Sequence, residues 1–203
     1  MCNGSRWFLK VKHNADGSLD RYKGRVVAKG YSQQPGFDFK ETFAPTVHYS
    51  TIRTILGLAA LEDLELRSVN ISHAYLNGIL EEEIYMQQPE GIEVGGPEYV
   101  CRLIKSLYGL KQAGRVWNRT LHAVLTSMGF SRVQSDHGLY ILLKDGTSTA
   151  AAAYANGPTQ NHWQQQQLIS MGPCEDIDSS SCICQWALAI SSVAAAAYAN
   201  GPT

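Results

Sequence analysis

Alternation of apolar and polar residues predicts strands through much of the first 147 residues. The segments 7–13 and 19–30 have the composition of two strands, and the run from Asn14 to Gly17 between them is a strong hairpin-turn signal. Further strands are predicted at 64–71, 84–88, 99–107 and 138–143. This part of the chain is therefore expected to fold as one unit of mixed helices and strands.

Two other segments have apolar residues at helical spacing. The first begins near Ser50 or Thr51, either of which can cap the N-terminus of a helix. The second carries an apolar stripe from Val116 to Met128 and is expected to end at Gly129, because glycine suits the left-handed conformation at a helix C-terminus. Both helices fall between predicted strands.

The chain changes character near residue 148. No lysine or arginine occurs after Lys144, and the ten residues AAAAYANGPT are found at both 150–159 and 194–203. Two short alanine-rich copies do not make a solenoid, which needs at least about three larger repeats. We therefore expect a folded domain at 1–148 and a low-complexity, disordered tail at 149–203.

Composition and charge are those of a soluble globular protein, with 44% apolar residues and a formal net charge of −1. No apolar run is long enough to cross a membrane, and the first residues lack the apolar core of a secretory signal. The expected location is intracellular, in the cytoplasm or the nucleus. The cysteines have neither the paired spacing nor the histidine partners of a zinc site, so no metal ligands are predicted from them.

Charge is distributed unevenly along the chain. Residues 1–40 hold eight basic and three acidic side chains, residues 41–100 hold two and ten, and residues 101–144 hold seven and one. Two basic segments would suit a phosphate backbone if the fold brings them together. The alternative is an ordinary solvated surface on each segment.

Four long segments, in this order, resemble the reverse transcriptase domain of copia-type retrotransposons. They are RYKGRVVAKGYSQQPGFDFKETFAPTV, SVNISHAYLNGILEEEIYMQQPEG, VCRLIKSLYGLKQAGRVWN and SDHGLYI, and the similarity covers about residues 6–147. The resemblance implies an α+β fold that comprises the fingers and part of the palm of a right-hand polymerase. It implies descent from an RNA-directed DNA polymerase, with Mg²⁺ as cofactor and a primer–template and deoxynucleoside triphosphates as partners.

The residues that such a polymerase needs for its metal ions are altered. Polymerases use two divalent ions about 4 Å apart, and magnesium prefers ionised carboxylate oxygens. The resemblance places Asn70 where the family has its first aspartate, and an amide offers only one neutral oxygen. This change alone is expected to cost roughly 10²–10³ in rate. The Tyr-x-Asp-Asp turn of the family is also missing, so no productive metal site is predicted.

Other carboxylates are not expected to replace the missing ones. Three consecutive glutamates at 81–83 are typical of a solvent-facing segment, and Asp136 suits a capping or structural role.

Several further positions match residues that contact nucleotide or template in the family. Basic side chains can bind phosphate, glycine permits a close backbone approach, and a tyrosine stands where the family has a ring beneath the sugar. The structural alternatives are solvated edge-strand lysines and a packed aromatic ring. The positions are Lys23, Arg25, Lys29, Tyr75, Gly109, Lys111, Gln112 and Arg115.

Three interpretations of function remain open. The chain is a polymerase remnant that is inactive alone, a nucleic-acid-binding module without catalysis, or a translated transposon fossil without a function. The exact repeat in the tail favours the first and third interpretations over the second.

Overall fold

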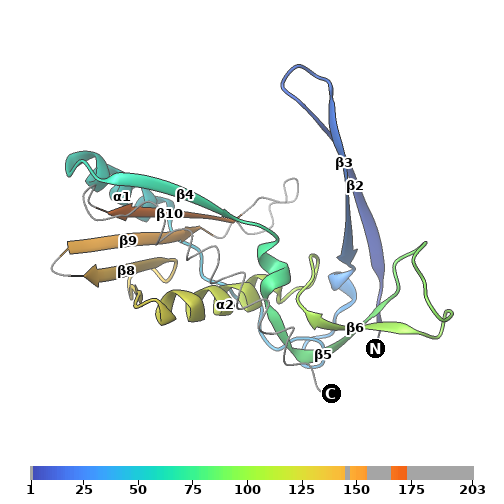
Figure 1. Cartoon of the computed structure of the whole chain (residues 1–203). Coiled ribbons are helices and arrows are strands. Elements are labelled where there is room, and N and C mark those ends of the chain that lie inside the picture. The colour runs from blue at the N-terminus through green and yellow to red at the C-terminus, as the bar shows by residue number, and fades with distance from the viewer. Residues whose placement is uncertain (1, 145–146, 155–165, 173–203) are drawn as a thin grey trace. The chain divides into compact units, whose positions relative to one another are not determined.

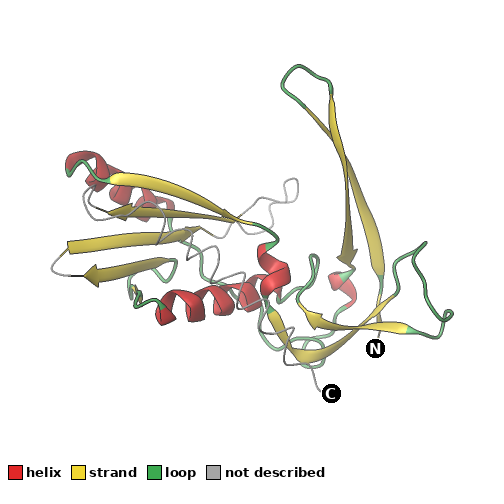
Figure 2. Cartoon of the chain, in the orientation of Figure 1, coloured by secondary structure: helices red, strands yellow, loops and turns green. Residues whose placement is uncertain are grey.

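The computed structural model describes residues 2–144, 147–154 and 166–172. The helices and strands of the chain are drawn in Figures 1 and 2. The chain divides into two compact units. Unit 1 consists of residues 1–43 and 78–116, and unit 2 consists of residues 44–77 and 117–203. Each unit is described by itself.

A long two-stranded hairpin forms much of unit 1 (Figure 1). Strand β2 (Ser5–His13) pairs antiparallel with strand β3 (Leu19–Ala28). At the tip Gly17 has a φ of +85°, and the N–H of Asn14 donates to the carbonyl of Ser18 at 2.9 Å. The predicted hairpin is confirmed, because the turn residues allow the positive φ that a tight turn requires.

A three-stranded sheet completes the regular structure of unit 1. Strand β1 (Cys2–Asn3) runs parallel to β5 (Ile79–Gln87), and β5 pairs antiparallel with β6 (Val100–Lys105). A short 3₁₀ helix, η1, follows the hairpin at Gly30–Ser32. The strands predicted at 84–88 and 99–107 are confirmed, although β5 begins earlier and includes the glutamates at 81–83.

Unit 2 contains a five-stranded sheet in the order β4-β10-β9-β8-β7. All four neighbouring pairs are antiparallel. The strands are β4 (Glu65–Ile71), β7 (Ser131–Arg132), β8 (Leu139–Lys144), β9 (Thr147–Tyr154) and β10 (Gln166–Gly172). Strands β4 and β8 match the expected strands at 64–71 and 138–143.

Helix α2 (Ala113–Ser127) supplies much of the main core of unit 2. Trp117, Leu121 and Leu125 are at most 4% exposed and pack with Ile71 of β4 and Tyr140 of β8. These helix positions follow the predicted spacing of three to four residues. After the helix Gly129 has a φ of +90°, so the predicted stop is confirmed.

Helix α1 (Tyr49–Leu61) is the first predicted helix and buries Ile55 and Ala59 against Val47. The expectation that Ser50 or Thr51 would be its N-cap residue is wrong. His48 occupies that position, and its side chain makes no capping hydrogen bond. The missing acceptor comes from a residue distant in sequence, as described below.

Most of strand β9, from residue 149 onward, and all of strand β10 lie in the segment 149–203, for which we expected disorder. Strand β9 pairs with β8 and β10, and β10 pairs with β4. Residues 155–165 and 173–203, which include the second AAAAYANGPT copy, lie outside the described residues. The domain boundary near 148 therefore stays a prediction. In the part of the chain that the structure describes, no helix is long and apolar enough to span a membrane.

Candidate functional site

The nine positions singled out by the sequence are divided between the two units. Unit 2 contains Asn70 and Tyr75. Unit 1 contains Lys23, Arg25, Lys29, Gly109, Lys111, Gln112 and Arg115. The candidate nucleotide-binding residues can therefore be described as a group in unit 1, and the degenerate metal position belongs to unit 2.

Lys23 and Arg25 lie on the same face of β3, because they are two residues apart in a strand. The guanidinium of Arg25 lies over the ring of Tyr108, 5.4 Å from its centroid. Burial lowers the pKa of Lys23, and the nearby charges of Arg25 and Lys12 lower it further. Both residues thus lie in a cationic environment, as their sequence context indicates.

Gly109 packs against the end of β3. The N–H of Ala28 donates to the carbonyl of Tyr108 at 2.8 Å, and the φ of Gly109 is +95°. A Cβ at Gly109 would clash with the carbonyl oxygen of Ala28. The close approach that only glycine permits is therefore made to another part of the protein. Lys29, next to Ala28, donates its N–H to the carbonyl of Gly4 at 2.8 Å.

Gln112 belongs to a buried polar network. Its side chain is 1% exposed, donates to the carbonyl of Asp38 at 2.8 Å, and accepts from the amide of Gln33 at 3.1 Å. Gln33 also accepts the backbone N–H of Lys111 at 2.8 Å. Gln33 and Asp38 could not be identified from the sequence, because their partners lie more than 70 residues away and no local pattern marks them.

The charged groups of Lys111 and Arg115 have partners within unit 1. The ammonium of Lys111 donates to the carbonyl of Gln33 at 3.3 Å and lies 4.9 Å from the ring centroid of Phe39. Arg115 makes a 2.6 Å ion pair with Glu41. Both cations therefore support the local fold, and their predicted contact with nucleotide or template stays a prediction.

Asn70 is the next-to-last residue of β4, and the register of the sheet aligns it with Tyr154, which was not among the predicted site residues. Asn70 is paired with Gln167 of β10, and Gln167 is paired with Tyr154 of β9. Tyr154 is the last residue of β9. The three residues thus form one cross-strand row, with Asn70 and Tyr154 on either side of Gln167.

Tyr75 lies on a short 3₁₀ helix, η2 (Ala74–Asn77), which follows β4. It is partly buried and packs against the core of unit 2 that contains Trp117. Just before it, His73 has a φ of +53°, which is uncommon for a residue with a side chain. Tyr75, the position matched to the sugar-contacting ring of the family, thus lies in a tightly turned segment and packs partly against the core of unit 2.

Asp136, in the matched SDHGLYI segment, has the structural role that we predicted. Its carboxylate accepts hydrogen bonds from the N–H of His48 at 2.9 Å, the hydroxyl of Thr51 at 2.6 Å and the N–H of Gly138 at 2.9 Å. The side chain is 4% exposed. Its oxygens thus bind donors from helix α1 and from the adjacent turn.

The residue type at position 70 does not fit the magnesium site of a polymerase. An amide stands at Asn70, and among the described residues no three histidine, cysteine or carboxylate side chains cluster closely enough to hold a metal ion.

Comparison with known proteins places the chain in a class. The family described as reverse transcriptase (RNA-dependent DNA polymerase) matches residues 2–155. The chain therefore belongs to the reverse transcriptase family, in the group found in Pol polyproteins of copia-type transposons. The match extends past residue 147 and includes Tyr154.

Three relatives are retrovirus-related Pol polyproteins of plant transposons. Transposon RE2 of Arabidopsis thaliana is 46% identical over 140 residues, or 68% of this chain and 10% of the relative. Transposon RE1 of Arabidopsis thaliana is 42% identical over 167 residues (78% and 11%), and TNT 1-94 of Nicotiana tabacum is 48% identical over 136 residues (66% and 10%). The chain thus spans about a tenth of the length of these relatives. No solved structure matches it.

Proposed function

We propose that this chain is a remnant of an RNA-directed DNA polymerase that has no catalytic activity of its own. The observation that carries the proposal is Asn70, an uncharged residue at the end of β4 where the family resemblance puts a metal-binding aspartate. In the same proposal unit 1 corresponds to the fingers and unit 2 to part of the palm. The long basic hairpin in unit 1 and Asn70 in unit 2 support that division.

The second carboxylate motif is present in altered form, rather than replaced. The family match reaches residue 155, and Tyr154 is followed in the sequence by Ala155, Asn156 and Gly157. Tyr-Ala-Asn-Gly has the tyrosine of Tyr-x-Asp-Asp and lacks both carboxylates. The register that aligns Tyr154 with Asn70 through Gln167 supports this correspondence, because Tyr154 and Asn70 are in the same sheet. On this proposal all three carboxylates are lost.

Primer extension on an RNA template, with Mg²⁺ or Mn²⁺, tests the proposal. The unmodified chain is expected to incorporate no nucleotide. Asn70→Asp alone is also expected to fail, because a single carboxylate cannot hold two divalent ions. The triple variant Asn70→Asp, Asn156→Asp, Gly157→Asp restores the full set and is expected to show metal-dependent incorporation above background.

Two outcomes would contradict the proposal in different ways. Metal-dependent incorporation by the unmodified chain would overturn its inactivity. A folded triple variant that binds Mn²⁺ no better than the unmodified chain, measured by isothermal titration, would overturn the correspondence of Tyr154 with the lost motif. The matched control is Asn77→Asp with Asn156→Asp and Gly157→Asp, which adds the same charge but leaves the first metal position unrepaired.

A second candidate function is nucleic-acid binding without catalysis. It is favoured by the concentration of basic residues on the hairpin of unit 1, and it does not depend on the missing carboxylates. An intracellular location, in the cytoplasm or the nucleus, accompanies both candidates.

A further inference from the structure

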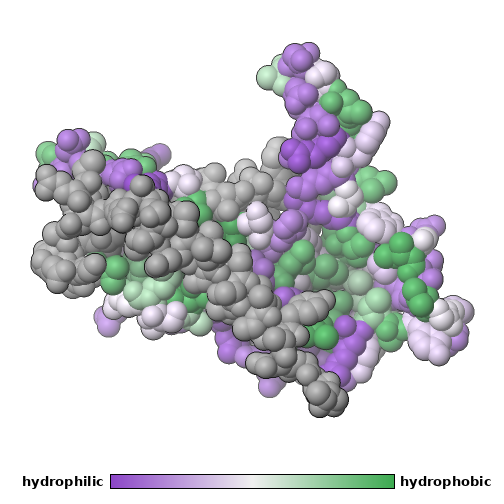
Figure 3. Space-filling view, in the orientation of Figure 1, coloured by the Kyte–Doolittle hydropathy of each residue, from purple (hydrophilic) through white to green (hydrophobic). Residues whose placement is uncertain are grey.

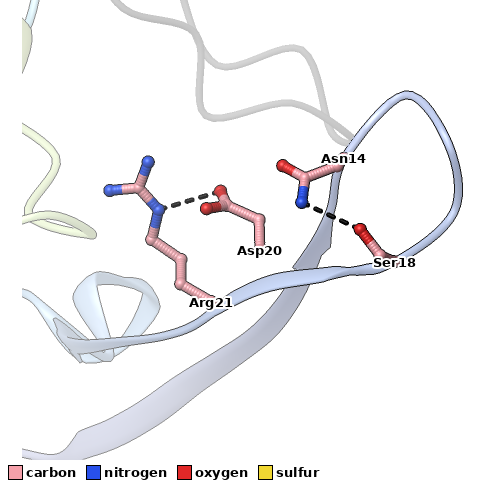
Figure 4. A network of polar contacts seen from close by, with 4 residues as sticks. All are labelled: Asn14, Ser18, Asp20 and Arg21. Carbon is pink, nitrogen blue, oxygen red and sulfur yellow. Dashed lines mark hydrogen bonds and ion pairs between the residues drawn. The ribbon is translucent and has the colours of Figure 1, made fainter.

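Polar contacts at the tip of the β2–β3 hairpin are exposed to water. Asn14 donates to Ser18 at 3.0 Å, and Arg21 makes a 2.9 Å ion pair with its neighbour Asp20 (Figure 4). Hydrophilic side chains extend along this hairpin in Figure 3. Exposed contacts of this kind contribute little to stability, because water competes for the same groups. A second polar cluster, within unit 2, differs because the hydroxyl at its centre is buried.

That hydroxyl belongs to Tyr140 of β8, a residue that is 0% exposed. Arg132, on β7, donates to it twice, from Nε at 2.9 Å and from a terminal nitrogen at 2.6 Å. The Nδ1 atom of His122, on α2, lies 3.2 Å from the same oxygen. Three elements of unit 2 therefore meet at one oxygen atom.

The donors and acceptors around this oxygen determine the protonation state of His122. An arginine side chain can only donate, so the two N–H groups of Arg132 occupy both acceptor positions of the Tyr140 hydroxyl. The hydroxyl must direct its own hydrogen to its third neighbour, the Nδ1 atom of His122. A ring nitrogen that accepts a hydrogen bond carries no proton. His122 is therefore neutral in this arrangement, with its hydrogen on Nε2.

A proton on Nδ1 of His122 would disrupt the cluster in two ways. Its N–H would face an oxygen whose lone pairs are already used, and the buried hydroxyl of Tyr140 would lose its acceptor. The positive ring would also lie near the guanidinium of Arg132. Burial lowers the pKa of His122, and the charge of Arg132 lowers it further, in agreement with this geometry.

The groups around His122 offer its protonated form no compensating charge. On α2 the hydroxyl of Thr126 lies 3.5 Å from Nδ1, and Arg132 and Tyr140 approach from β7 and β8. Arg132 also donates to the amide oxygen of Asn118 at 3.3 Å, so its printed partners are neutral. Among the residues that the structure describes, no carboxylate makes an ion pair with His122 or Arg132. Protonation is therefore relieved by movement of the His122 ring away from Tyr140.

Strand β7 is the element that this movement should affect most. It contributes two residues to the edge of the sheet and pairs only with β8 among the described strands. The contacts of Arg132 with Tyr140 and Asn118 join it to β8 and to α2. Beyond the strand, the N–H of Val133 donates to the carbonyl of Leu139 at 3.0 Å. A segment with so few backbone hydrogen bonds depends strongly on its side-chain contacts.

We propose that His122 acts as a pH-sensitive switch, which holds β7 and β8 against α2 while its ring is neutral and releases β7 when its ring is protonated. This proposal goes beyond the proposed function and requires neither catalysis nor nucleic acid. The folded-state pKa of His122 is lowered, so its stabilisation is complete above the unfolded-state value of about 6.5. The stabilisation is lost as the pH falls through the folded-state value.

Hydrogen exchange of the full chain, followed by mass spectrometry at about pH 7.5 and pH 5.5 and corrected for intrinsic rates, tests the proposal. Peptides that contain β7 should lose protection about tenfold or more at the lower pH. His122→Asn should abolish this loss, because its amide oxygen can accept from Tyr140 but does not titrate. The matched control His137→Asn, at an exposed histidine of the same unit, should lose protection as the unmodified chain does.

Titration of the His122 ring by NMR gives a second measurement that does not depend on a variant. The ring should titrate at a lower pH in the folded chain than in the chain unfolded by urea. Tyr140→Phe removes the hydrogen that Nδ1 accepts and should raise the pH at which the folded ring titrates. The proposal is overturned if His122→Asn keeps the pH-dependent loss of protection, if the ring titrates alike in the folded and unfolded chain, or if Tyr140→Phe leaves its titration unchanged.

Discussion

The hydroxyl of Thr51 donates a 2.6 Å hydrogen bond to the carboxylate of Asp136, although 85 residues separate them in the sequence. Helix α1 begins at Tyr49 with no capping bond from the side chain of His48. Asp136 therefore supplies both the acceptor and the negative charge that stabilise the N-terminus of a helix. Asp136, one residue of the SDHGLYI segment, is thus explained by its role in the fold.

Asp136→Asn is expected to destabilise the chain. The substitution keeps the size of the side chain but removes its charge and replaces one acceptor oxygen with a donor, which faces the N–H and O–H groups of His48 and Thr51. Loss of a helix cap costs about 0.5–2 kcal/mol, and we expect a value near the upper end because the site is buried. Chemical denaturation gives the free energy of unfolding. The adjacent exposed Ser135→Ala serves as control and should change it by less than about 0.5 kcal/mol.

Lowering the pH should remove the stabilisation that the charged carboxylate of Asp136 provides. Burial raises the pKa of Asp136, but the hydrogen bonds from Thr51, His48 and Gly138 lower it by more, so the net pKa lies below its ordinary value. A carboxyl whose folded-state pKa is depressed stabilises the fold above its unfolded-state pKa, and that stability is lost as the pH falls through the folded-state value. The difference in unfolding free energy between the unmodified chain and Asp136→Asn should therefore be constant near pH 6 and shrink below about pH 4. A difference that is the same at pH 6 and pH 3 would show that the charge of Asp136 does not contribute.

The sequence correctly predicted those features of the fold that depend on residues close together in the chain. The hairpin turn at 14–17 and the helix stop at Gly129 both follow from residues that tolerate positive φ. The cap of α1 could not be predicted, because its acceptor is 85 residues away and Thr51 looked sufficient by itself. Strand β9 was missed because its four consecutive alanines give neither alternation nor high β-propensity. Strand β10 is a short segment whose pairing depends on the neighbouring strands β4 and β9.

Gly109→Ala is expected to disrupt unit 1. The backbone at Gly109 is left-handed, and an added Cβ would clash with the carbonyl of Ala28, so the contact between the 106–112 loop and β3 must open. We expect a loss of about 2 kcal/mol or more in unfolding free energy. Gly17→Ala is a matched control, because Gly17 has a similar φ of +85° but no atom near the new Cβ. Its cost should be limited to the backbone term of about 1 kcal/mol. Equal losses from the two variants would show that the contact with Ala28 is unimportant.

The sequence predicted which residue types form the candidate site, but not the contacts that their side chains make. Basic residues on the hairpin could be named from the sequence because strand alternation alone puts Lys23 and Arg25 on one face. The partners of Lys111, Gln112 and Arg115 could not, since Gln33 and Glu41 are joined to them only by the folded chain. A residue that a family comparison predicts to bind a ligand can therefore have a side chain that already contacts other residues of the protein.

The substitution Gln112→Leu distinguishes a structural role of Gln112 from a role in ligand binding. Gln112 donates to the carbonyl of Asp38 and accepts from Gln33, and it is almost completely buried. Leucine is similar in size but would leave the buried Gln33 amide and the Asp38 carbonyl without those partners, at a cost of about 1–3 kcal/mol for each unsatisfied group. If Gln112 is structural, unfolding free energy should fall by about 2–4 kcal/mol, while oligothymidylate affinity, measured below the unfolding transition, should stay within twofold. Gln34→Leu, at the exposed neighbour of Gln33, controls for the added apolar surface. A variant that keeps full stability but loses affinity would instead assign Gln112 to the ligand.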